Sequence, residues 1–543
     1  MDPFTPILFL SIGAIAVLIG SNRSYGFYGF TASIAIVGAI AATLLLGYRT
    51  PATVVLSPWQ TQSVFLYPLS LTIDKASWFL ALLLVMTIMC LLSISLSVHL
   101  NVSPKERAVC LMVVALALLA LFSDNLITLV LALTVLDVFN GLFAFVSKHR
   151  SNLSRGIKKN LQMPEIVRFG INVLSIGLVL LVALDGHAQT FSIGDASILI
   201  IVAMIRINIY PVNAGLVLSH FSSRVVATVI SLVNVIIAVN ILVLFGLYES
   251  VTTLRSVLTV LAIMSGLVGG YRWCTATKHV ERLHSFLLAQ IGLIVLTFLW
   301  AGDWAVVGVF SHMISMALSV LVIYVSGGLF GSTTARYIKP LLTGLVFGCQ
   351  PLTAGFFGVF VLYSGLIDYL AWSMFVVPSI IVINGLTMVG GWRLLQLPFV
   401  DRGRQPPIVV LAKVLAIGVP LLASLAVGII PSKFSSLLGL PITRFWVNVL
   451  NVSGLTALGS SVMSASLAML LWYYRSTVLL LVKNVSESRL RYVADVRWLH
   501  LAIWRIYRDI GKSLRVPADI LEGQGGILWS LVIVFAILLV VGV

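Results

Sequence analysis

Two apolar stretches of this sequence carry the features that could move an ion through a membrane. Arg206-Ile-Asn-Ile-Tyr-Pro211 places a positive charge and a proline late in one apolar run, and Pro351-Leu-Thr-Ala-Gly355 places a proline inside another. Proline removes a backbone hydrogen bond from a helix, and such breaks persist in lipid only where protein or water satisfies the freed backbone. Broken helices at corresponding places in two halves indicate an ion path between repeats. Pro211 and Pro351 are therefore the predicted broken-helix positions.

Four ionisable side chains within apolar runs are candidates for such a path: Asp137, Arg206, His312 and Lys413. Intramembrane charges are rare and functional by default, and Asp137 could pair with Arg206. That pair could instead be a structural bond between two spans, and Arg206 or Lys413 could reach the surface by snorkelling. His312 could be a relic of a proton path or a polar side chain bonded to a backbone carbonyl. The sequence leaves these alternatives open.

The composition excludes a soluble protein. Of 543 residues, 60% are hydrophobic and 10% are charged, and apolar runs of roughly 20 residues, as a bilayer requires, fill most of the chain. The four cysteines have no metal-type spacing. There is no cysteine cluster, nucleotide-binding glycine loop or haem-like histidine pair. We therefore expect no cofactor, no metal and no catalytic residue in this chain.

The sequence predicts an all-α polytopic membrane protein with about sixteen transmembrane helices. Lysine and arginine accumulate in alternate loops, which the positive-inside rule assigns to the cytoplasm. The formal charge of +16 is explained by this bias, so nucleic acid is not an expected partner. We expect an integral protein of a bacterial cytoplasmic membrane, with the N- and C-termini on the outer side.

The segment after the fifteenth predicted span has a different pattern. Basic residues alternate with apolar residues at helical spacing over residues 475–520, which is typical of a helix lying in the membrane interface. This helix could rest on anionic lipid, or it could be a lateral tether packed against other spans or a neighbouring subunit. A final transmembrane helix is expected over residues 521–543.

The middle of the chain resembles the antiporter-like membrane subunits of respiratory complex I, Mrp cation/proton antiporters and membrane-bound hydrogenases. Arg206 through Asn213 is similar to the family's lysine-x-x-x-x-Pro-x-His stretch in its seventh span. Pro351-Leu-Thr-Ala-Gly355-Phe-Phe-Gly358 is similar to the Pro-Pro-Thr-Ala-Gly-Phe-Phe-Gly stretch of its twelfth span. Three further matches follow the family's order: 123–131, 279–292 and 522–526.

The resemblance implies two inverted five-helix repeats, each with a broken helix. We expect an N-terminal three-helix segment (1–104) and an antiporter-like core (105–400), whose repeats cover about 105–250 and 251–400. Spans fourteen and fifteen (401–474), the amphipathic lateral helix (475–520) and the final span (521–543) follow.

The sequence departs from the family where the family places its proton carriers. Buried carboxylates, lysines and histidines can pass protons because their pKa values shift and couple, whereas arginine stays charged. The positions matched to the family's carriers are occupied by Thr134, Arg206, Ile230, Ser315, Ser319 and Val359. Asp137 follows Thr134 by one helical turn, on the same face, and could substitute for the missing carboxylate or form a structural ion pair with Arg206.

Three functions are compatible with these residues. The first is a degenerate antiporter-like subunit with a structural, coupling or docking role in a complex I-, Mrp- or hydrogenase-like assembly. The second is an active proton- or sodium-translocating subunit with a path rebuilt through Asp137, Arg206 and His312. The third is an unrelated secondary transporter. In the first two, the expected partners are other antiporter-like subunits and a soluble catalytic module, and redox chemistry of the quinone oxidoreductase type would belong to those other subunits.

Overall fold

The computed structural model describes most of the chain between residues 2 and 474. The described ranges are 2–22, 25–57, 68–95, 102–149, 155–184, 192–212, 224–247, 254–276, 279–325, 343–395, 407–440 and 450–474. The predicted lateral helix (475–520) and final span (521–543) lie outside these ranges.

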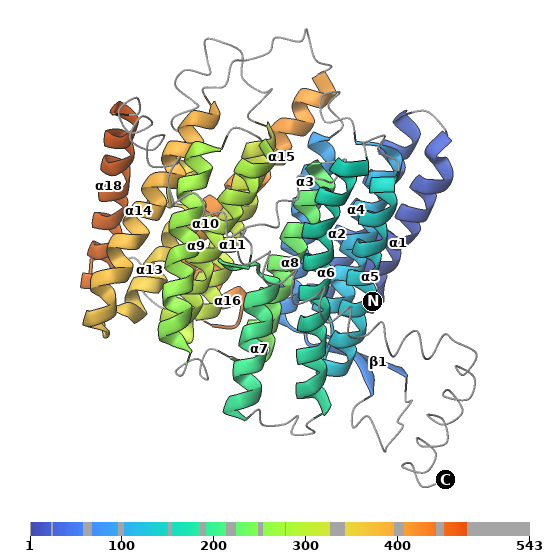
Figure 1. The fold of residues 1–543 in the computed structure, drawn as a ribbon, viewed down its shortest axis with the longest axis horizontal. Coiled ribbons are helices and arrows are strands. Elements are labelled where there is room, and N and C mark those ends of the chain that lie inside the picture. Colours follow the sequence, from blue (N-terminus) through green and yellow to red (C-terminus); the bar gives the residue numbers. More distant parts are fainter. Residues whose placement is uncertain are drawn as a thin grey trace.

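Three helices open the chain: α1 (Phe4–Ile19), α2 (Tyr25–Gly47) and α3 (Lys75–Ile94). Asp74 starts α3 through a capping box, because its side chain accepts from the Ser77 N–H at 2.7 Å. In Figure 1, α1 lies at one edge of the elongated bundle and α3 lies further inside, and α2 packs against both.

Five helices form the next group: α4 (Pro104–Leu121), α5 (Leu126–His149), α6 (Arg155–Leu184), α7 (Ile193–Arg206) and α8 (Arg224–Leu244). Consecutive members pack against each other, and α4 also packs against α8. At 14 residues, α7 is too short to span a bilayer, since about 20 residues are required.

A second group repeats this neighbour pattern. It consists of α9 (Arg255–Thr275), α10 (His279–Trp300), α11 (Ala305–Val325), a short helical stretch at 343–347, α13 (Ala354–Leu366) and α14 (Leu370–Leu395). Here α9 packs against both α10 and α14, and α13 packs against α11 and α14. The contact of α9 with α14 therefore corresponds to that of α4 with α8.

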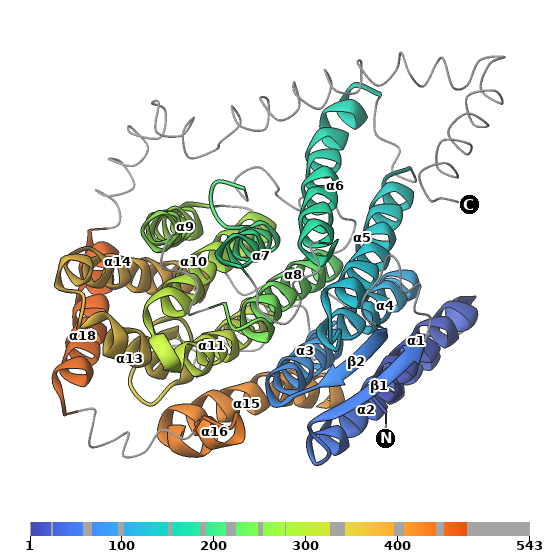
Figure 2. The ribbon, with the colours of Figure 1, turned by 90° about the horizontal axis from the view of Figure 1, so that it is seen from below.

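Three more helices complete the described chain: α15 (Pro407–Ile429), α16 (Pro431–Leu437) and α18 (Val452–Tyr473). The chain bends by 100° between α15 and α16, where Pro431 begins the second helix. In the view along the bundle, α15 lies against α3 and α11, and α18 lies at the far end beside α14 (Figure 2).

A small antiparallel sheet lies between α2 and α3. β1 (Ala52–Ser57) pairs with β2 (Leu69–Ile73), and the β-branched residues in both strands favour extended backbone. The Thr72 N–H of β2 donates to the Phe122 carbonyl in the turn between α4 and α5, at 2.7 Å. The all-α prediction is therefore wrong in one respect: the described part of the chain is mostly helical but also contains this two-stranded sheet.

The core of the bundle lies around α8, α10 and α11. In the apolar windows of these helices 94% of residues are buried, whereas the value is 33% in α18. Within the described residues, nine helices are long and apolar enough to cross a membrane, or ten if α15 and α16 form one bent span. The protein is therefore an integral membrane protein built mainly of helices.

Candidate functional site

The helix α7 ends at Arg206, and the backbone that follows is irregular. Asn208 adopts a positive φ of 60°, a conformation that asparagine tolerates better than most residues, and its side chain donates to the Arg206 carbonyl at 3.1 Å. The Tyr210 N–H donates to the Ser265 hydroxyl of α9 at 2.9 Å. Pro211 then lies in this non-helical segment, where its missing N–H costs no helical hydrogen bond.

Arg206 and Asp137 form a buried ion pair between α7 and α5. Arg206 Nη2 donates to Asp137 Oδ2 at 2.7 Å, and the two side chains are 1% and 2% exposed. A charge in this environment is tolerated only when it is paired and hydrogen-bonded. The structure therefore brings together two of the four predicted ion-path residues, although they are 69 positions apart in sequence.

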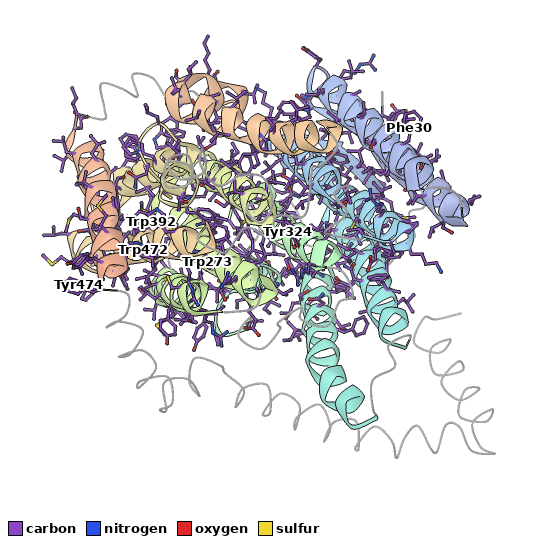
Figure 3. The ribbon with its side chains drawn as sticks, turned by 90° about the horizontal axis from the view of Figure 1, so that it is seen from above. Phe30, Trp273, Tyr324, Trp392, Trp472 and Tyr474 are labelled. Atoms are coloured by element: carbon purple, nitrogen blue, oxygen red, sulfur yellow. The ribbon has the colours of Figure 1, made fainter. Side chains whose placement is uncertain are left out.

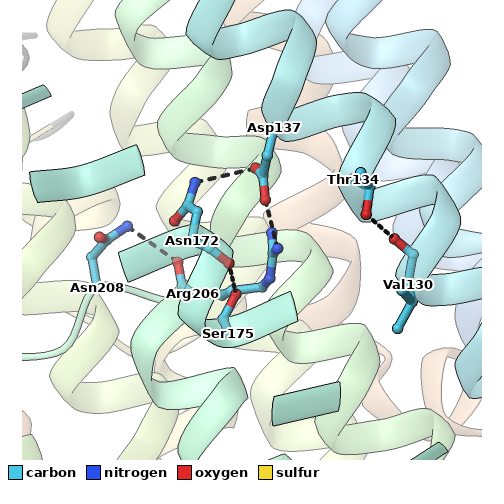
Figure 4. Close-up of polar contacts among 7 residues, drawn as sticks. All are labelled: Val130, Thr134, Asp137, Asn172, Ser175, Arg206 and Asn208. Atoms are coloured by element: carbon cyan, nitrogen blue, oxygen red, sulfur yellow. Dashed lines mark hydrogen bonds and ion pairs between the residues drawn. The ribbon is translucent and has the colours of Figure 1, made fainter. Parts of the chain in front are cut away.

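Asn172 of α6 supplies the second contact to the carboxylate. Its Nδ2 donates to Asp137 Oδ1 at 3.1 Å, and its carbonyl accepts from the Ser175 hydroxyl at 2.7 Å (Figure 4). Asn172 is not among the site residues predicted from the sequence. The sequence feature that could have indicated it is an amide side chain near the start of an apolar run of mostly aliphatic residues.

The guanidinium of Arg206 is only partly satisfied. Its Nε and Nη1 are buried and have no hydrogen-bond partner among the described residues. The guanidinium of arginine can donate five hydrogen bonds. Its bond to Asp137 uses only Nη2, so most of these donors have no partner among the described residues. The guanidinium is therefore hydrogen-bonded on the side of Asp137, while its other two nitrogens are buried without a partner among the described residues.

Thr134 does not share the environment of Asp137, contrary to the expectation that the two lie on one face. Thr134 is exposed on the surface of α5, and its hydroxyl donates to the Val130 carbonyl of its own helix at 2.7 Å. Figure 4 shows that the Thr134 hydroxyl contacts Val130 of its own helix, whereas the Asp137 carboxylate contacts Arg206 and Asn172. Two side chains three residues apart on an α-helix differ by about 60° in direction around the helix axis. In α5 this difference places Asp137 in the interior and Thr134 on the surface.

The second break, at residues 348–353, has two non-glycine residues with positive φ, Cys349 at 46° and Leu352 at 72°. Such conformations persist where the surroundings fix them. Pro351 lies between these two residues. The helix resumes as α13 at Thr353, whose hydroxyl caps it by accepting from the Phe356 N–H at 3.3 Å.

Hydroxyl groups from three neighbouring helices lie within hydrogen-bond distance of the carbonyls at this break, and each hydroxyl shares its proton with a slightly closer carbonyl of its own helix. Ser319 of α11 donates to Val346 O at 3.0 Å, Thr387 of α14 donates to Phe347 O at 2.9 Å, and Ser461 of α18 donates to Cys349 O at 3.4 Å. On the other side of the break, the Ala354 N–H donates to the Ser424 hydroxyl of α15 at 3.2 Å. Neutral side chains thus take up backbone groups that could otherwise coordinate water or a cation.

His312 lies in the middle of the second group of helices. Its side chain is 0% exposed, and neither ring nitrogen has a hydrogen-bond partner among the described residues. The ring packs on Gly358 of α13, where an added Cβ would come within 2.6 Å of it. Val359 and Ser315, at two of the positions matched to the family's proton carriers, are also buried.

The remaining predicted site residue, Lys413, belongs to α15, but its side chain falls outside the described part of the structure. Among the residues that the structure describes, no three His, Cys, Asp or Glu side chains gather as metal ligands. The hydroxyl groups at the second break are the contacts that sequence reasoning did not find. Isolated serines and threonines in apolar spans could have indicated these contacts, but which carbonyl each one contacts depends on how the helices pack.

Comparisons by sequence give no relative: no family model matches the chain, and no curated protein matches it. The fold, however, is shared with three solved membrane complexes. A chain of the archaeal membrane-bound sulfane sulfur reductase, a respiratory membrane complex, has a TM-score of 0.66 at 14% identity, over 99% of this chain and 100% of that one.

Two further solved complexes contain a chain with the same fold. A chain of respiratory complex I from Thermus thermophilus with bound NADH has a TM-score of 0.63 at 13% identity, over 85% of this chain and 100% of that one. A chain of the Mrp complex from Dietzia sp. DQ12-45-1b has a TM-score of 0.69 at 14% identity, over 100% of this chain and 63% of that longer chain. This chain therefore shares its fold with chains of these membrane complexes, which include the complex I and Mrp types that its motifs resemble.

Proposed function

We propose that this chain is a subunit of a multi-subunit ion-translocating membrane complex in which its role is structural, coupling or docking. Its fold neighbours belong to a sulfane sulfur reductase, complex I and an Mrp complex, which supports an assembly of that kind. Other antiporter-like subunits are its partners, and a soluble catalytic module attached to them would supply any redox chemistry.

The observation that carries this proposal is the neutral interior of the second group of helices. In the middle of α9 to α14, His312 is the one imidazole or charged side chain among the described residues, and it has no polar partner there. Proton transfer needs a chain of donors and acceptors linked by side chains or water. At the break near Pro351, hydroxyls already engage the freed carbonyls. The described residues of this half therefore do not supply the proton carriers that a complete path would need.

The matching neighbour contacts of the two helix groups support two inverted five-helix repeats with breaks near Pro211 and Pro351. Each group closes through a contact between its first and last helices. We retain the sixteen-span topology with both termini outside, and a bacterial cytoplasmic membrane, as parts of the same proposal.

A second candidate is an active subunit with a path rebuilt through Asp137, Arg206 and His312. The unused donors of Arg206 and the unbonded nitrogens of His312 favour it, because buried polar atoms without protein partners often bond to ordered water. The unrelated-transporter alternative has less support, because the fold is shared with subunits of ion-translocating complexes along nearly the whole chain.

The two candidates separate in one experiment on the intact assembly. The complex is purified from its native membrane in a mild detergent, its subunits are identified, and ion flux is measured in vesicles for wild type and for Asp137→Leu/Arg206→Met. A structural subunit predicts co-purified antiporter-like subunits and flux within about twofold of wild type, since a buried pair can be replaced by apolar groups without loss of stability.

Loss of flux from a variant complex that retains all its subunits would support the rebuilt path and reject the structural role. Purification of the chain alone would reject the docking role. Thr134→Ala is the matched control, because this side chain lies on the surface of the same helix as Asp137 and bonds only within it.

A further inference from the structure

Three arginines meet at one end of the second group of helices. Arg272 lies in the last turn of α9, Arg282 in the first turn of α10 and Arg393 in the last turn of α14. These three helices pack against one another. The positive-inside rule assigns this end to the cytoplasmic face, and we call Arg282 with Arg393 the arginine site.

Both side chains of the arginine site donate hydrogen bonds to backbone carbonyls at the C-terminal end of α9. Arg282 is 7% exposed, and its Nε donates to the Ala276 carbonyl at 2.8 Å. Arg393 donates through Nη1 to the Cys274 carbonyl. The two accepting carbonyls belong to residues only two positions apart, so both guanidinium groups lie at the same end of α9. Neither forms an ion pair with a carboxylate of the described chain.

The end of α9 balances only part of this charge. The last carbonyls of a helix carry the equivalent of about half a negative charge, whereas the arginine site carries two positive charges. Repulsion between like charges strengthens as they leave water, and Arg282 is almost fully buried. The site therefore has an excess of positive charge that an anion would neutralise. Guanidinium groups in pairs suit phosphate, whose oxygens accept several parallel hydrogen bonds.

Aromatic side chains place the arginine site at the depth of lipid headgroups. Trp392 precedes Arg393 and stacks edge-on with Trp472 of α18, with ring centroids 5.9 Å apart. Tyr474, which follows α18, is 51% exposed. Seen from above, Trp392, Trp472 and Tyr474 lie together at one side of the bundle (Figure 3). Such aromatic belts mark the membrane–water interface.

We propose that the arginine site binds the phosphate of an anionic phospholipid headgroup at the inner face of the membrane. The inference rests on two guanidinium groups at one helix end, without a carboxylate partner and beside an aromatic belt. It is independent of whether the chain translocates ions.

Native mass spectrometry of the detergent-purified protein tests this site. The protein is loaded with phosphatidylglycerol or with phosphatidylcholine of identical acyl chains, and the bound fractions are compared for wild type and Arg393→Gln. We expect preferential retention of phosphatidylglycerol, and binding about tenfold weaker or more in the variant, because a charge-assisted hydrogen bond is lost. Arg393→Lys, which keeps the charge, should retain part of the preference.

Arg255→Gln is the matched control. Arg255 starts the same helix, α9, at its opposite end and stacks on Trp300 and Tyr369, 5.2 and 5.5 Å from the ring centroids, so its replacement should leave lipid retention unchanged. The contrary outcome is that millimolar inorganic phosphate displaces the lipid from wild type and that phosphate binding is lost in Arg393→Gln. That result would identify the ligand as soluble phosphate and overturn the lipid assignment. Equal retention of both lipids, or full retention by a correctly eluting Arg393→Gln protein, would overturn the site.

Discussion

The ion pair between Asp137 and Arg206 makes the sharpest prediction, because its two charges are almost completely removed from solvent. Asp137→Asn keeps the shape of the side chain and removes its charge. Arg206 would then be a buried cation whose Nη2 has lost its carboxylate and whose Nε and Nη1 already lack partners. Removing one partner of a buried pair costs about 3–5 kcal/mol, so we expect this loss of stability in the single variant.

The double variant Asp137→Leu/Arg206→Met should behave differently. It removes both charges together with the cost of burying them. Its free energy of unfolding should therefore equal that of wild type or exceed it by up to about 4 kcal/mol. Asp137→Leu, Arg206→Met and the double variant form a double-mutant cycle, which should give a coupling free energy of about 3 kcal/mol or more. Thr134→Ala, on the exposed side of the same helix, should change stability by less than about 0.5 kcal/mol.

Thermal unfolding in detergent can be followed with a thiol-reactive dye. Cys90, Cys110 and Cys349 are buried free thiols, so they react when the helices separate. The expected order of midpoints places Asp137→Asn well below wild type and the double variant at or above it. A single variant as stable as Thr134→Ala, with a coupling free energy near zero, would refute the idea that the pair is buried and charged.

Two further predictions concern the second group of helices. Ser319→Ala should destabilise the protein by about 1–3 kcal/mol, because the Val346 carbonyl at the break loses its side-chain donor; an unchanged thermal midpoint would contradict the role of hydroxyls there. Gly358→Ala should cost about 1–3 kcal/mol through overpacking, since the new Cβ would lie 2.6 Å from the His312 ring. Restoring the midpoint with His312→Ala in the same chain would locate the clash, and no rescue would place its cause elsewhere.

The sequence by itself determined the class of the protein and the places where its helices are interrupted. Hydropathy and proline act locally, so a run of apolar residues indicates a membrane helix wherever it packs. The irregular backbone around Pro211 and Pro351 follows from the same local chemistry. The order of motifs also indicated the antiporter-like fold that the solved complexes share.

Only the tertiary structure decided which polar groups meet. Asp137 faces Arg206 and Asn172, while Thr134 three residues away faces outward, because the rotation of α5 about its axis is set by the packing of its neighbours. The hydroxyl contacts at the second break and the arginine site likewise join helices that are distant in sequence. Periodicity marks a polar residue on a helix, but its partner depends on how helices pack in three dimensions.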